Sequence, residues 1–347
     1  MKVTMADVAR AARVSRATVS LALRHRNEIP ESTRRKVHAA AQRLGYVPHP
    51  LVSALMATRR GKNRAFQASL AFLTAFPTKE GWRTVSQAYA ALFAGAQARA
   101  QQLGYALHEV WLRDPRVDPR RQSQILQARG VQGLLVAPLP AENAVTPAIA
   151  WEAFSVLAVG YSVREPAFHR ISHDYFHGMS LALQQCRAKG YRRIGFFLDR
   201  RVSHVIAHLW HAAYLAEQNT TPGVEAIEPL LAERWDDPQI LRWLKQQRLD
   251  ALICLDAWRL QAIHHVPASL PLICLNTDES PHPLPGIRRD FSLIGHAAID
   301  RLVSLVQTNQ RGTPDRVQTV LLEGEWTHGD RLSRKGQPLG TLSQRGH

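Results

Sequence analysis

The chain has few cysteines and no long apolar run. Its 3 cysteines, Cys186, Cys254 and Cys274, are far apart and form no CxxC pair. This odd, scattered set argues against a disulfide framework and indicates reduced core residues of a cytoplasmic protein. The N-terminal residues lack the apolar run of a signal peptide, and no later stretch approaches the roughly 20 apolar residues that span a bilayer. We therefore expect a soluble, cytoplasmic protein without a membrane partner.

Sequence motifs of several common enzyme classes are also missing. The chain contains no P-loop, no GxGxxG that opens a βαβ unit, no HExxH and no GxSxG. His208 and His211 would share one helical face, and His264 and His265 are adjacent, but no Cys or third His stands at ligand spacing. We expect these to be surface histidines. The sequence therefore predicts no enzyme, with no catalytic residue, metal site or cofactor.

Acidic residues are scarce near the N-terminus. Residues 1–64 carry 14 Lys and Arg against 3 Asp and Glu, a net charge of +11, whereas the other 283 residues carry 30 against 25. A basic run is usually a solvated face, but this one coincides with a helical motif, which favours a polyanion partner over a membrane surface. At 347 residues the chain is also too long for one ordinary core and indicates two or three domains.

The basic segment has the pattern of three short helices. Two helix starts, Thr4–Asp7 and Ser15–Thr18, leave room between them only for the tight turn of a helix-turn-helix. Ser15 can cap the second helix by accepting a backbone N–H. A third helix is expected over about 32–44, ended by Gly45, which tolerates a left-handed C-cap. The apolar seam expected between the helices consists of Val8, Ala12, Val14, Val19 and Leu23.

Several spaced motifs of this segment together resemble a known family. They are Val3–Arg10, Val14–Ser20, Thr33-Arg34 and Leu44–Pro48, and the match continues without a gap to Leu55. The segment resembles the head of the LacI/GalR (lac-repressor) family of transcriptional regulators. The resemblance implies an N-terminal all-α helix-turn-helix DNA-binding head. It also implies a two-lobed α/β core of two doubly wound parallel sheets, like that of the periplasmic binding proteins.

The head differs from the family pattern at three positions. Arg13 stands where the family has a glycine in the turn, and Leu21 where it has an arginine after the Thr-Val-Ser run. Met56 stands where a basic residue usually follows the hinge leucine. The fold prediction survives these changes, whereas the operator sequence becomes harder to infer.

The second helix is expected to enter the major groove with its first residues toward the base edges. The resemblance places Arg16 and Ala17 at the reading positions. The planar guanidinium of Arg16 fits O6 and N7 of guanine, and Ala17 offers a methyl to thymine or leaves room. Leu21 is either a base-methyl contact or a solvent-facing residue without a role. Arg24 is expected to contact the DNA backbone.

Short hydroxyl residues stand at or near the helix starts. There they suit phosphate contacts, which position a helix without reading sequence. Simple helix capping is the alternative for each, and for Ser15 both roles can coexist. These residues are Thr4, Ser15, Thr18 and Ser20.

Residues 48–64 form the expected hinge helix and basic linker between a head at 1–47 and a core at 65–347. A proline pair suits the helix start, but the helix that follows is too short to be stable alone. The resemblance implies that it forms on DNA, pairs with its two-fold mate and inserts Leu55 into a minor-groove step, which kinks the duplex. An ordinary linker is the alternative.

From Ala68 onward short apolar runs alternate with helical segments, the pattern of parallel α/β sheets with crossover helices. Two such sets indicate two doubly wound lobes. The second set begins with an expected strand at Ile171–Asp174, and one of its helices is expected over Ser203–Gln218. The resemblance implies three crossings between lobes, near Ser162, Asp290 and Glu325. The expected bounds are about 65–161 and 291–325 for lobe 1, and 162–290 and 326–347 for lobe 2.

Ligands of open parallel sheets bind beyond the carboxyl ends of the strands, so an effector is expected in the cleft between the lobes. Asp174 fits a family aspartate and could accept hydrogen bonds from ligand hydroxyls. Asp256 stands where relatives often have Asn, and a helix N-cap is an equal alternative for it. The expected lining residues are Phe76, Trp82, Asp174, Trp210 and Asp256.

Two positions depart from the family's usual effector contacts. Trp210 replaces an arginine and Thr277 replaces an aspartate. Stacking of a sugar on Trp82, Trp210 or Trp258 could take over, although a buried Trp is more often a core residue. We expect a small polar effector, with a carbohydrate as the leading class.

The sequence therefore predicts a sequence-specific DNA-binding transcriptional regulator, a repressor by family precedent. We expect a homodimer, or a higher oligomer, on a pseudo-palindromic double-stranded operator. A small-molecule effector between the lobes would switch operator affinity through its differential affinity for two states. Release from DNA and recruitment to it both stay open. The alternative is an effector-binding protein or enzyme of periplasmic-binding-protein-like fold in which the head is secondary.

Overall fold

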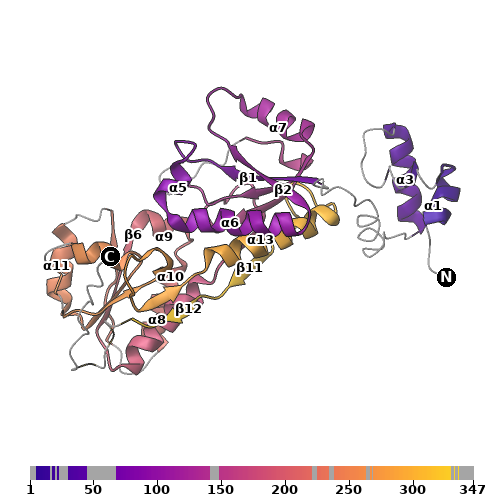
Figure 1. Cartoon of the computed structure of the whole chain (residues 1–347). Helices are drawn as coiled ribbons and strands as arrows, with labels where there is room; N and C mark the ends of the chain where they lie inside the picture. Colours follow the sequence, from indigo (N-terminus) through magenta and orange to yellow (C-terminus); the bar gives the residue numbers. More distant parts are fainter. Residues whose placement is uncertain are drawn as a thin grey trace. The chain divides into compact units, whose positions relative to one another are not determined.

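The computed structural model divides the chain into two units (Figure 1). They comprise Met1–Ala65, here called the head, and Phe66–His347, here called the body. The structure describes residues 5–15, 18–19, 22, 30–44, 68–140, 148–220, 225–233, 238–262, 266–267, 269–329, 332 and 335. Over these ranges, no helix combines the length and the apolar character needed to cross a membrane.

The head is built on a small apolar core. Helices α1 (Met5–Ala12) and α3 (Glu31–Leu44) contribute to it. Val8 and Val19, both expected in the seam, are fully buried there together with Val37. Leu23, Gly45 and the expected hinge at 48–64 lie outside the described residues.

Helix α1 ends in a left-handed residue. Arg13 has a φ of 54° and donates its N–H to the Arg10 carbonyl at 3.3 Å. The N–H of Val14 reaches back to the Ala9 carbonyl at 3.0 Å. This pair of bonds is the Schellman arrangement, in which the left-handed position usually holds a glycine. The arginine therefore occupies the turn without changing its backbone path.

The first sheet of the body contains six strands in the order β11-β5-β4-β3-β1-β2. All neighbouring pairs are parallel. Apolar clusters cover both of its faces, as a doubly wound sheet requires. The strands are β1 (Ala68–Thr74), β2 (Tyr105–Trp111), β3 (Val131–Val136), β4 (Ser155–Val159), β5 (His169–His173) and β11 (Thr319–Leu322).

Two long helices, α6 (Gln87–Gln102) and α13 (Phe291–Gln307), lie side by side against the first sheet (Figure 1). Their backbones meet at Gly95 and Gly295. A Cβ on Gly95 would lie 2.2 Å from the Ser292 carbonyl oxygen, and one on Gly295 would lie 2.2 Å from that of Leu92. The crossing therefore requires glycine. The remaining helices of this lobe are α5 (Gly81–Val85), α7 (Pro119–Ala128) and the 3₁₀ turn η1 (Trp151–Ala153).

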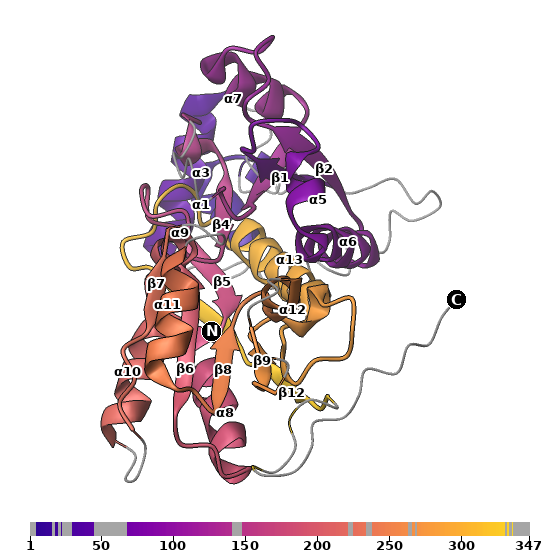
Figure 2. The ribbon, with the colours of Figure 1, turned by 90° about the vertical axis from the view of Figure 1, so that its left-hand side faces the viewer.

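The second sheet has the order β12-β10-β9-β8-β6-β7 and is parallel except for the pair β10 and β12. Figure 2 shows β6, β8 and β9 side by side. The strands are β6 (Ile194–Asp199), β7 (Leu230–Ala232), β8 (Ala251–Cys254), β9 (Leu272–Cys274), β10 (Gly286–Arg288) and β12 (Glu325–Thr327). The helices are α8 (Tyr175–Ala188), α9 (Arg200–Val205), α10 (Leu209–Thr220), α11 (Pro238–Gln247), α12 (Ala257–Ala262) and the 3₁₀ turn η2 (Thr277–Glu279).

The strand expected at Ile171–Asp174 lies in the other sheet. It is β5, and it pairs with β4 and β11 of the first sheet. The first crossing between lobes therefore follows β5 rather than lying near Ser162. The other two crossings lie between β10 and α13 and between β11 and β12. The crossing near Ser162 was wrongly predicted because the sequence of a strand does not indicate which sheet it joins. Tertiary contacts determine that pairing.

The helix expected over Ser203–Gln218 is broken in two. Ala207 and His208 have φ values of 56° and 59°, which a continuing α-helix does not allow. The His208 N–H donates to the Ser203 carbonyl at 2.8 Å, and the two side chains also contact each other, Oγ to Nδ1, at 3.0 Å. These local bonds end α9 and let α10 start in a new direction. Neither residue is a glycine, so the break had no sequence signal.

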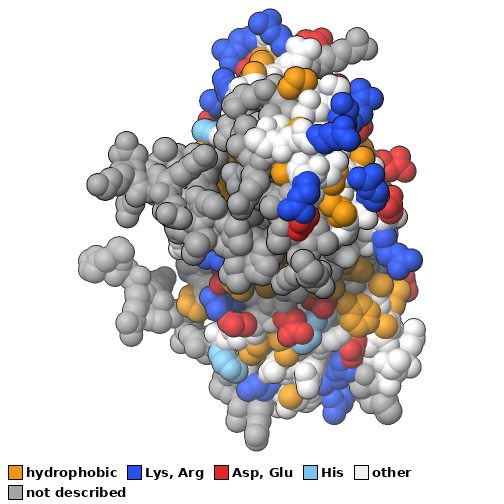
Figure 3. All heavy atoms as spheres, turned by 90° about the vertical axis from the view of Figure 1, so that its right-hand side faces the viewer, with side chains coloured by type: hydrophobic (Ala, Val, Ile, Leu, Met, Phe, Trp, Pro, Cys, Tyr) orange, Lys and Arg blue, Asp and Glu red, His pale blue; other side chains and the backbone are white. Residues whose placement is uncertain are grey.

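Charged side chains of both signs are visible on the molecular surface. On the face drawn in Figure 3, Lys and Arg side chains are interspersed with Asp, Glu and apolar ones over the described atoms. Residues 1–64 carry a net charge of +11, whereas the rest of the chain carries 30 Lys and Arg against 25 Asp and Glu. The excess of positive charge therefore belongs mainly to the N-terminal segment.

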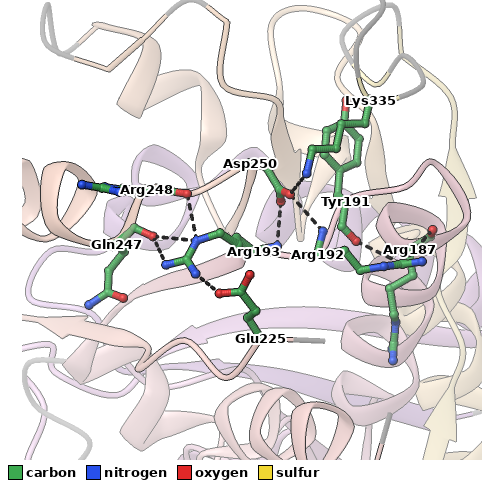
Figure 4. A network of polar contacts seen from close by, with 9 residues as sticks. All are labelled: Arg187, Tyr191, Arg192, Arg193, Glu225, Gln247, Arg248, Asp250 and Lys335. Atoms are coloured by element: carbon green, nitrogen blue, oxygen red, sulfur yellow. Dashed lines mark hydrogen bonds and ion pairs between the residues drawn. The ribbon is translucent and has the colours of Figure 1, made fainter. Parts of the chain in front are cut away.

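A polar network in the second lobe connects residues at the start of β6 with residues before β8 (Figure 4). The Asp250 carboxylate accepts the backbone N–H groups of Arg192 and Arg193 at 3.0 and 2.9 Å, and pairs with Lys335 Nζ at 2.8 Å. The Arg193 guanidinium donates to the Gln247 carbonyl at 2.7 Å. The network ties the start of β6 to the turn before β8 and to Lys335, near the C-terminus.

Candidate functional site

A cavity of about 450 Å³ lies between the two lobes of the body. Parallel strands of both sheets end at it, as expected for sheets of this kind. His173 ends β5 in the first lobe, Asp199 ends β6 in the second, and Asn276 follows β9. The volume falls within the roughly 300–1,000 Å³ of small-molecule sites.

Aromatic side chains form one wall of this cavity. Tyr89, Tyr175, Trp210 and Phe291, here called the aromatic wall, all line it. The rings of Tyr175 and Trp210 meet edge to face with centroids 5.0 Å apart, and those of Tyr89 and Phe291 with centroids 6.4 Å apart. Such a wall offers apolar faces on which a flat or ring-shaped ligand can stack.

The guanidinium of Arg289 lies against the aromatic wall. Its Cζ is 4.6 Å from the ring centroid of Phe291, 5.2 Å from that of Tyr175 and 5.4 Å from that of Trp210. Nη2 donates to the Tyr175 hydroxyl over 3.4 Å, a long hydrogen bond. Nε is buried and has no partner among the residues that the structure describes.

Three more buried groups of the lining have unused hydrogen-bonding capacity. They are Ser172 Oγ, both ring nitrogens of His173 and Asn276 Oδ1, which find no partner in the described part of the chain. Burial lowers the pKa of His173 well below its usual value, and the nearby Arg289 charge lowers it further, so the ring is neutral. A neutral imidazole offers one donor and one acceptor. Hydroxyl groups of a ligand could satisfy all three residues.

The carboxylates of the lining are engaged in different ways. Burial raises the pKa of Asp256 to about 6, against the opposing effect of Arg259, whose Nη1 lies 3.5 Å from it. Asp199 accepts the Arg201 N–H at 2.8 Å and pairs with the guanidinium of the same residue at 2.8 Å. Glu279 extends from the second lobe and accepts the Ala88 N–H at 3.1 Å, at the start of α6 in the first.

Three of the five expected lining residues are found at the cavity. They are Phe76, Trp210 and Asp256. Asp256 keeps its carboxylate at the cavity, with the Arg259 guanidinium as its neighbour. Trp258, also considered as a stacking platform, packs partly buried against the core of the second lobe.

Trp82 was wrongly expected at the cavity. Its side chain is 1% exposed, and its ring centroid lies 5.4 Å from each of those of Phe72 and Phe93 in the core of the first lobe. Its Nε1 donates to Glu109 at 2.9 Å. The indole is therefore a core residue with its single donor satisfied, the common fate of a buried tryptophan.

Asp174 was also wrongly expected to line the cavity. Its carboxylate accepts the His177 N–H at 2.9 Å and caps α8. The residue before it, His173, lines the cavity instead. Asp174 follows the end of β5 and serves as the N-cap of α8, so its carboxylate is used at the helix start rather than at the cavity.

Sequence reasoning missed Arg289, Asn276 and Glu279. Arg289 follows the three-residue strand β10, which was too short to be recognised in the sequence. Asn276 and Glu279 follow β9, where a polar residue at the end of an apolar run was a usable signal. Among described residues, no group of three or more His, Cys, Asp or Glu is arranged to hold a metal ion.

In the head, Ser15 has the expected capping role. Its Oγ accepts the Thr18 N–H at 3.0 Å and lies 2.9 Å from the Thr18 hydroxyl, and both side chains are accessible. Capping thus leaves Ser15 exposed to an outside partner. The other residues expected to contact DNA lie outside the described ranges: Thr4, Arg16, Ala17, Ser20, Leu21, Arg24 and Leu55.

The head and the body each resemble known proteins. Residues 4–49 match the family model described as bacterial regulatory proteins, lacI family. Over 195 residues, 56% of the chain, the sequence is 29% identical to the HTH-type transcriptional regulator PtxS of Pseudomonas plecoglossicida. The chain spans about half of that relative's length, 53%.

Solved structures share the fold over most of the chain. The lac repressor dimer bound to operator and the anti-inducer ONPF superposes with a TM-score of 0.53 at 22% identity, covering 94% of this chain and 98% of that one. The complex of the transcriptional regulator CelR with cellobiose gives a TM-score of 0.54 at 18% identity, covering 94% and 99%.

These matches confirm the fold class and the resemblance expected from the sequence. Helices α1 and α3 lie within the part matched by the family model, and the two-lobed body corresponds to the structural neighbours. Residues 4–49 therefore match the lacI family of bacterial regulatory proteins, and the body has the fold of the lac repressor.

Proposed function

We propose that the chain is a transcriptional repressor whose operator affinity is switched by a small polar effector, a carbohydrate or a derivative of one. The observation that carries the proposal is the cavity between the lobes, lined by an aromatic wall and by buried polar groups with unused hydrogen-bonding capacity. A lacI-family head on the same chain gives ligand binding there a DNA-binding output. The CelR neighbour is a regulator in complex with cellobiose.

DNA recognition is assigned to the head. Arg16 and Ala17 would read base edges, and the hydroxyls of Ser15 and Thr18 would contact phosphates. Leu55 would enter the minor groove and kink the duplex. A homodimer would place two heads on a pseudo-palindromic operator. The lac repressor neighbour is a dimer bound to its operator.

Signal transfer would depend on the angle between the lobes. The contact between Glu279 and the start of α6 joins them beside the cavity. A ligand held by both lobes stabilises one arrangement over the other, in proportion to its differential affinity. The hinges expected at 48–64 of the two protomers would then move together or apart. No catalytic step is part of this proposal, and the matched PtxS is named as a transcriptional regulator.

Selection of operator sequences tests the proposal. Purified full-length protein is mixed with random duplexes and with genomic fragments at physiological salt, and bound DNA is sequenced. We expect a two-fold symmetric motif.

Arg16→Ala should weaken binding to this motif and relax the preference at one base position, at a cost in binding free energy of roughly 1–3 kcal/mol. Arg192→Gln, an exposed change in the second lobe, is the control that should leave the motif unchanged. Absence of any preferred duplex would refute the proposal.

A further inference from the structure

We infer that the effector is a sugar-sized, hydroxylated carboxylic acid whose carboxylate pairs with Arg289. The inference rests on the proposed function and names the chemistry of its effector. It comes from the one lining arginine that makes no ion pair within the described protein, and from the polar groups around that arginine.

The other two lining cations have carboxylate partners. Arg201 pairs with Asp199 at 2.8 Å, and Arg259 pairs with Asp256 at 3.5 Å. Arg289 has no carboxylate within ion-pair distance in the ranges that the structure describes, and its only side-chain hydrogen bond is the long one to Tyr175. A guanidinium has five N–H donors in a planar fork that matches the two oxygens of a carboxylate. Most of these donors are unused here.

The surroundings hold the guanidinium in place. Three rings of the aromatic wall approach Arg289, with Cζ to centroid distances of 4.6–5.4 Å. Its backbone N–H is fixed to Asp278 at 2.9 Å. Stacking on aromatic faces leaves the edge of the guanidinium, where the donors are, available to a ligand. A cation held in this way costs little further ordering when an anion binds.

The lining carboxylates form no ion pair with Arg289 and are held by other groups. Glu279 is held by the N–H of Ala88 and the hydroxyl of Ser86 at the start of α6, where the helix dipole favours a negative charge. Asp199 and Asp256 have arginine partners of their own. The formal charges of the lining balance, but in the described part of the chain Arg289 is the lining arginine without a carboxylate within ion-pair distance. An added anion therefore has one preferred location.

The neutral polar groups specify the rest of the ligand. Ser172, His173 and Asn276 provide donors and acceptors that hydroxyl groups can satisfy. The aromatic wall provides faces for a sugar ring. A carboxylate is favoured over a phosphate ester because one guanidinium neutralises one negative charge, whereas a phosphate monoester carries about −1.5 to −2 at pH 7. The carboxylates of Asp256 and Glu279, which also line the cavity, would repel the additional charge.

Calorimetric titration of the full-length protein tests the inference. The probes are the aldonic and uronic acids of glucose and galactose, the parent neutral sugars and their 6-phosphates. We expect at least one acid to bind at least about 10-fold more tightly than its parent sugar and its phosphate, since a charge-assisted pair adds to the shared hydroxyl contacts. Arg289→Gln should abolish this preference, and Arg289→Lys should keep part of it.

Matched controls separate the charge of Arg289 from the integrity of the fold. Arg192→Gln removes an exposed arginine of the same lobe and should leave acid binding unchanged. Thermal unfolding of Arg289→Gln reports whether that variant is folded. If Arg289→Gln is unfolded, Arg289→Lys decides the question. A folded Arg289→Lys that still prefers acids over neutral sugars supports the inference, and a folded Arg289→Lys without this preference opposes it.

The outcomes distinguish this inference from the proposed function. The inference is overturned if neutral sugars or sugar phosphates bind as tightly as every acid. It is also overturned if no acid of the panel binds. If a neutral sugar then changes operator affinity, the proposed function stands without it. If the same preparation selects no operator, the proposed function itself fails.

Discussion

Arg13 occupies a backbone position that favours glycine. Its φ of 54° lies in the left-handed region, which costs an L-residue with a side chain roughly 1–2 kcal/mol. We predict that Arg13→Gly raises the free energy of unfolding of the head by about 1 kcal/mol, because the relief of strain exceeds the added entropy of the unfolded chain. Hydrogen exchange of the α1 and α3 amides in the full-length protein measures the change.

The control for this prediction is a glycine in ordinary helical backbone. Arg35 is exposed within α3 and pairs with Glu31 at 3.5 Å. Arg35→Gly should lower the stability of the head by about 1 kcal/mol, the usual penalty of glycine in a helix. Equal effects of the two substitutions would show that the turn at Arg13 is not strained.

Asp256 gives the body a pH-dependent stability. Burial raises its pKa from 3.8 to about 6, so the folded state binds the proton more tightly than the unfolded state. Its ionisation therefore costs stability as the pH rises from about 4 to about 6, and the full cost persists above pH 6. We predict that Asp256→Asn increases the free energy of unfolding by about 2 kcal/mol at pH 8 and has little effect at pH 4.

Urea denaturation of wild type and Asp256→Asn at the two pH values measures this difference. Asp199→Asn is the comparison, because that carboxylate is paired with Arg201 and caps α9. Removing its charge should lower stability at pH 8. A stabilisation by Asp256→Asn that is the same at both pH values would exclude the burial of its charge as the cause.

At the scale of elements, the crossing of α6 and α13 depends on glycine. A Cβ at residue 95 would overlap the Ser292 carbonyl oxygen, and relieving this overlap would require a shift of the helix backbone. We predict that Gly95→Ala lowers the free energy of unfolding of the body by about 3 kcal/mol, near the upper end of overpacking effects. Thermal or urea unfolding provides the measurement.

Gly178 on α8 is the matched control for Gly95. A Cβ there would meet only Ile287, at 3.7 Å, which is ordinary contact. Gly178→Ala should therefore raise stability by about 0.5–1 kcal/mol through helix propensity. Equal and small effects at the two glycines would show that α6 and α13 are not in close contact.

The contact between Glu279 and the start of α6 couples the two lobes. Glu279 accepts both the Ser86 hydroxyl and the Ala88 N–H. We predict that a double-mutant cycle of Ser86→Ala and Glu279→Gln gives a coupling energy of about 1 kcal/mol in unfolding experiments. Glu80, an exposed partner of Arg83, replaces Glu279 in the control cycle. Additive effects of Ser86→Ala and Glu279→Gln would mean that the side chains do not interact.

The main elements could be predicted because their apolar patterns are long. Strands β1 to β4 and helices α6, α11 and α13 follow from such patterns. Strands β7, β10 and β12 have three residues each, too few for a period to be visible. The edge strand β11 is short and largely exposed, so its three apolar residues were not recognised as a strand. Its pairing with β5 depends on contacts across more than 140 residues, which no local pattern encodes.

The candidate site could be predicted only in part. Phe76 and Asp256, each two residues after the end of a strand, were found because the ends of parallel strands share one edge of a sheet. Trp82 was misplaced because indole chemistry suits a core as well as a ligand platform. Arg289 was missed because its location depends on the crossing after β10. Whether a charged side chain has a partner becomes visible only when the fold is known.

At the scale of the whole molecule, the proposal joins a basic head to a body that binds a ligand between its lobes. The head carries most of the excess positive charge, which provides non-specific affinity for DNA. The cavity provides the chemical selectivity, through Arg289 and the polar groups beside it. The two functions are separable by mutation: changes at Arg16 should alter operator choice, and changes at Arg289 should alter only the response to ligand.

The most direct test measures the affinity of the full-length protein for its selected operator with and without a bound effector. The account predicts that the operator is preferred over random duplex by at least about 10³-fold at physiological salt. It also predicts that a saturating ligand in the cavity changes that affinity by roughly 5-fold or more, a typical allosteric coupling. Equal affinity for operator and random duplex, with and without ligand, would contradict it.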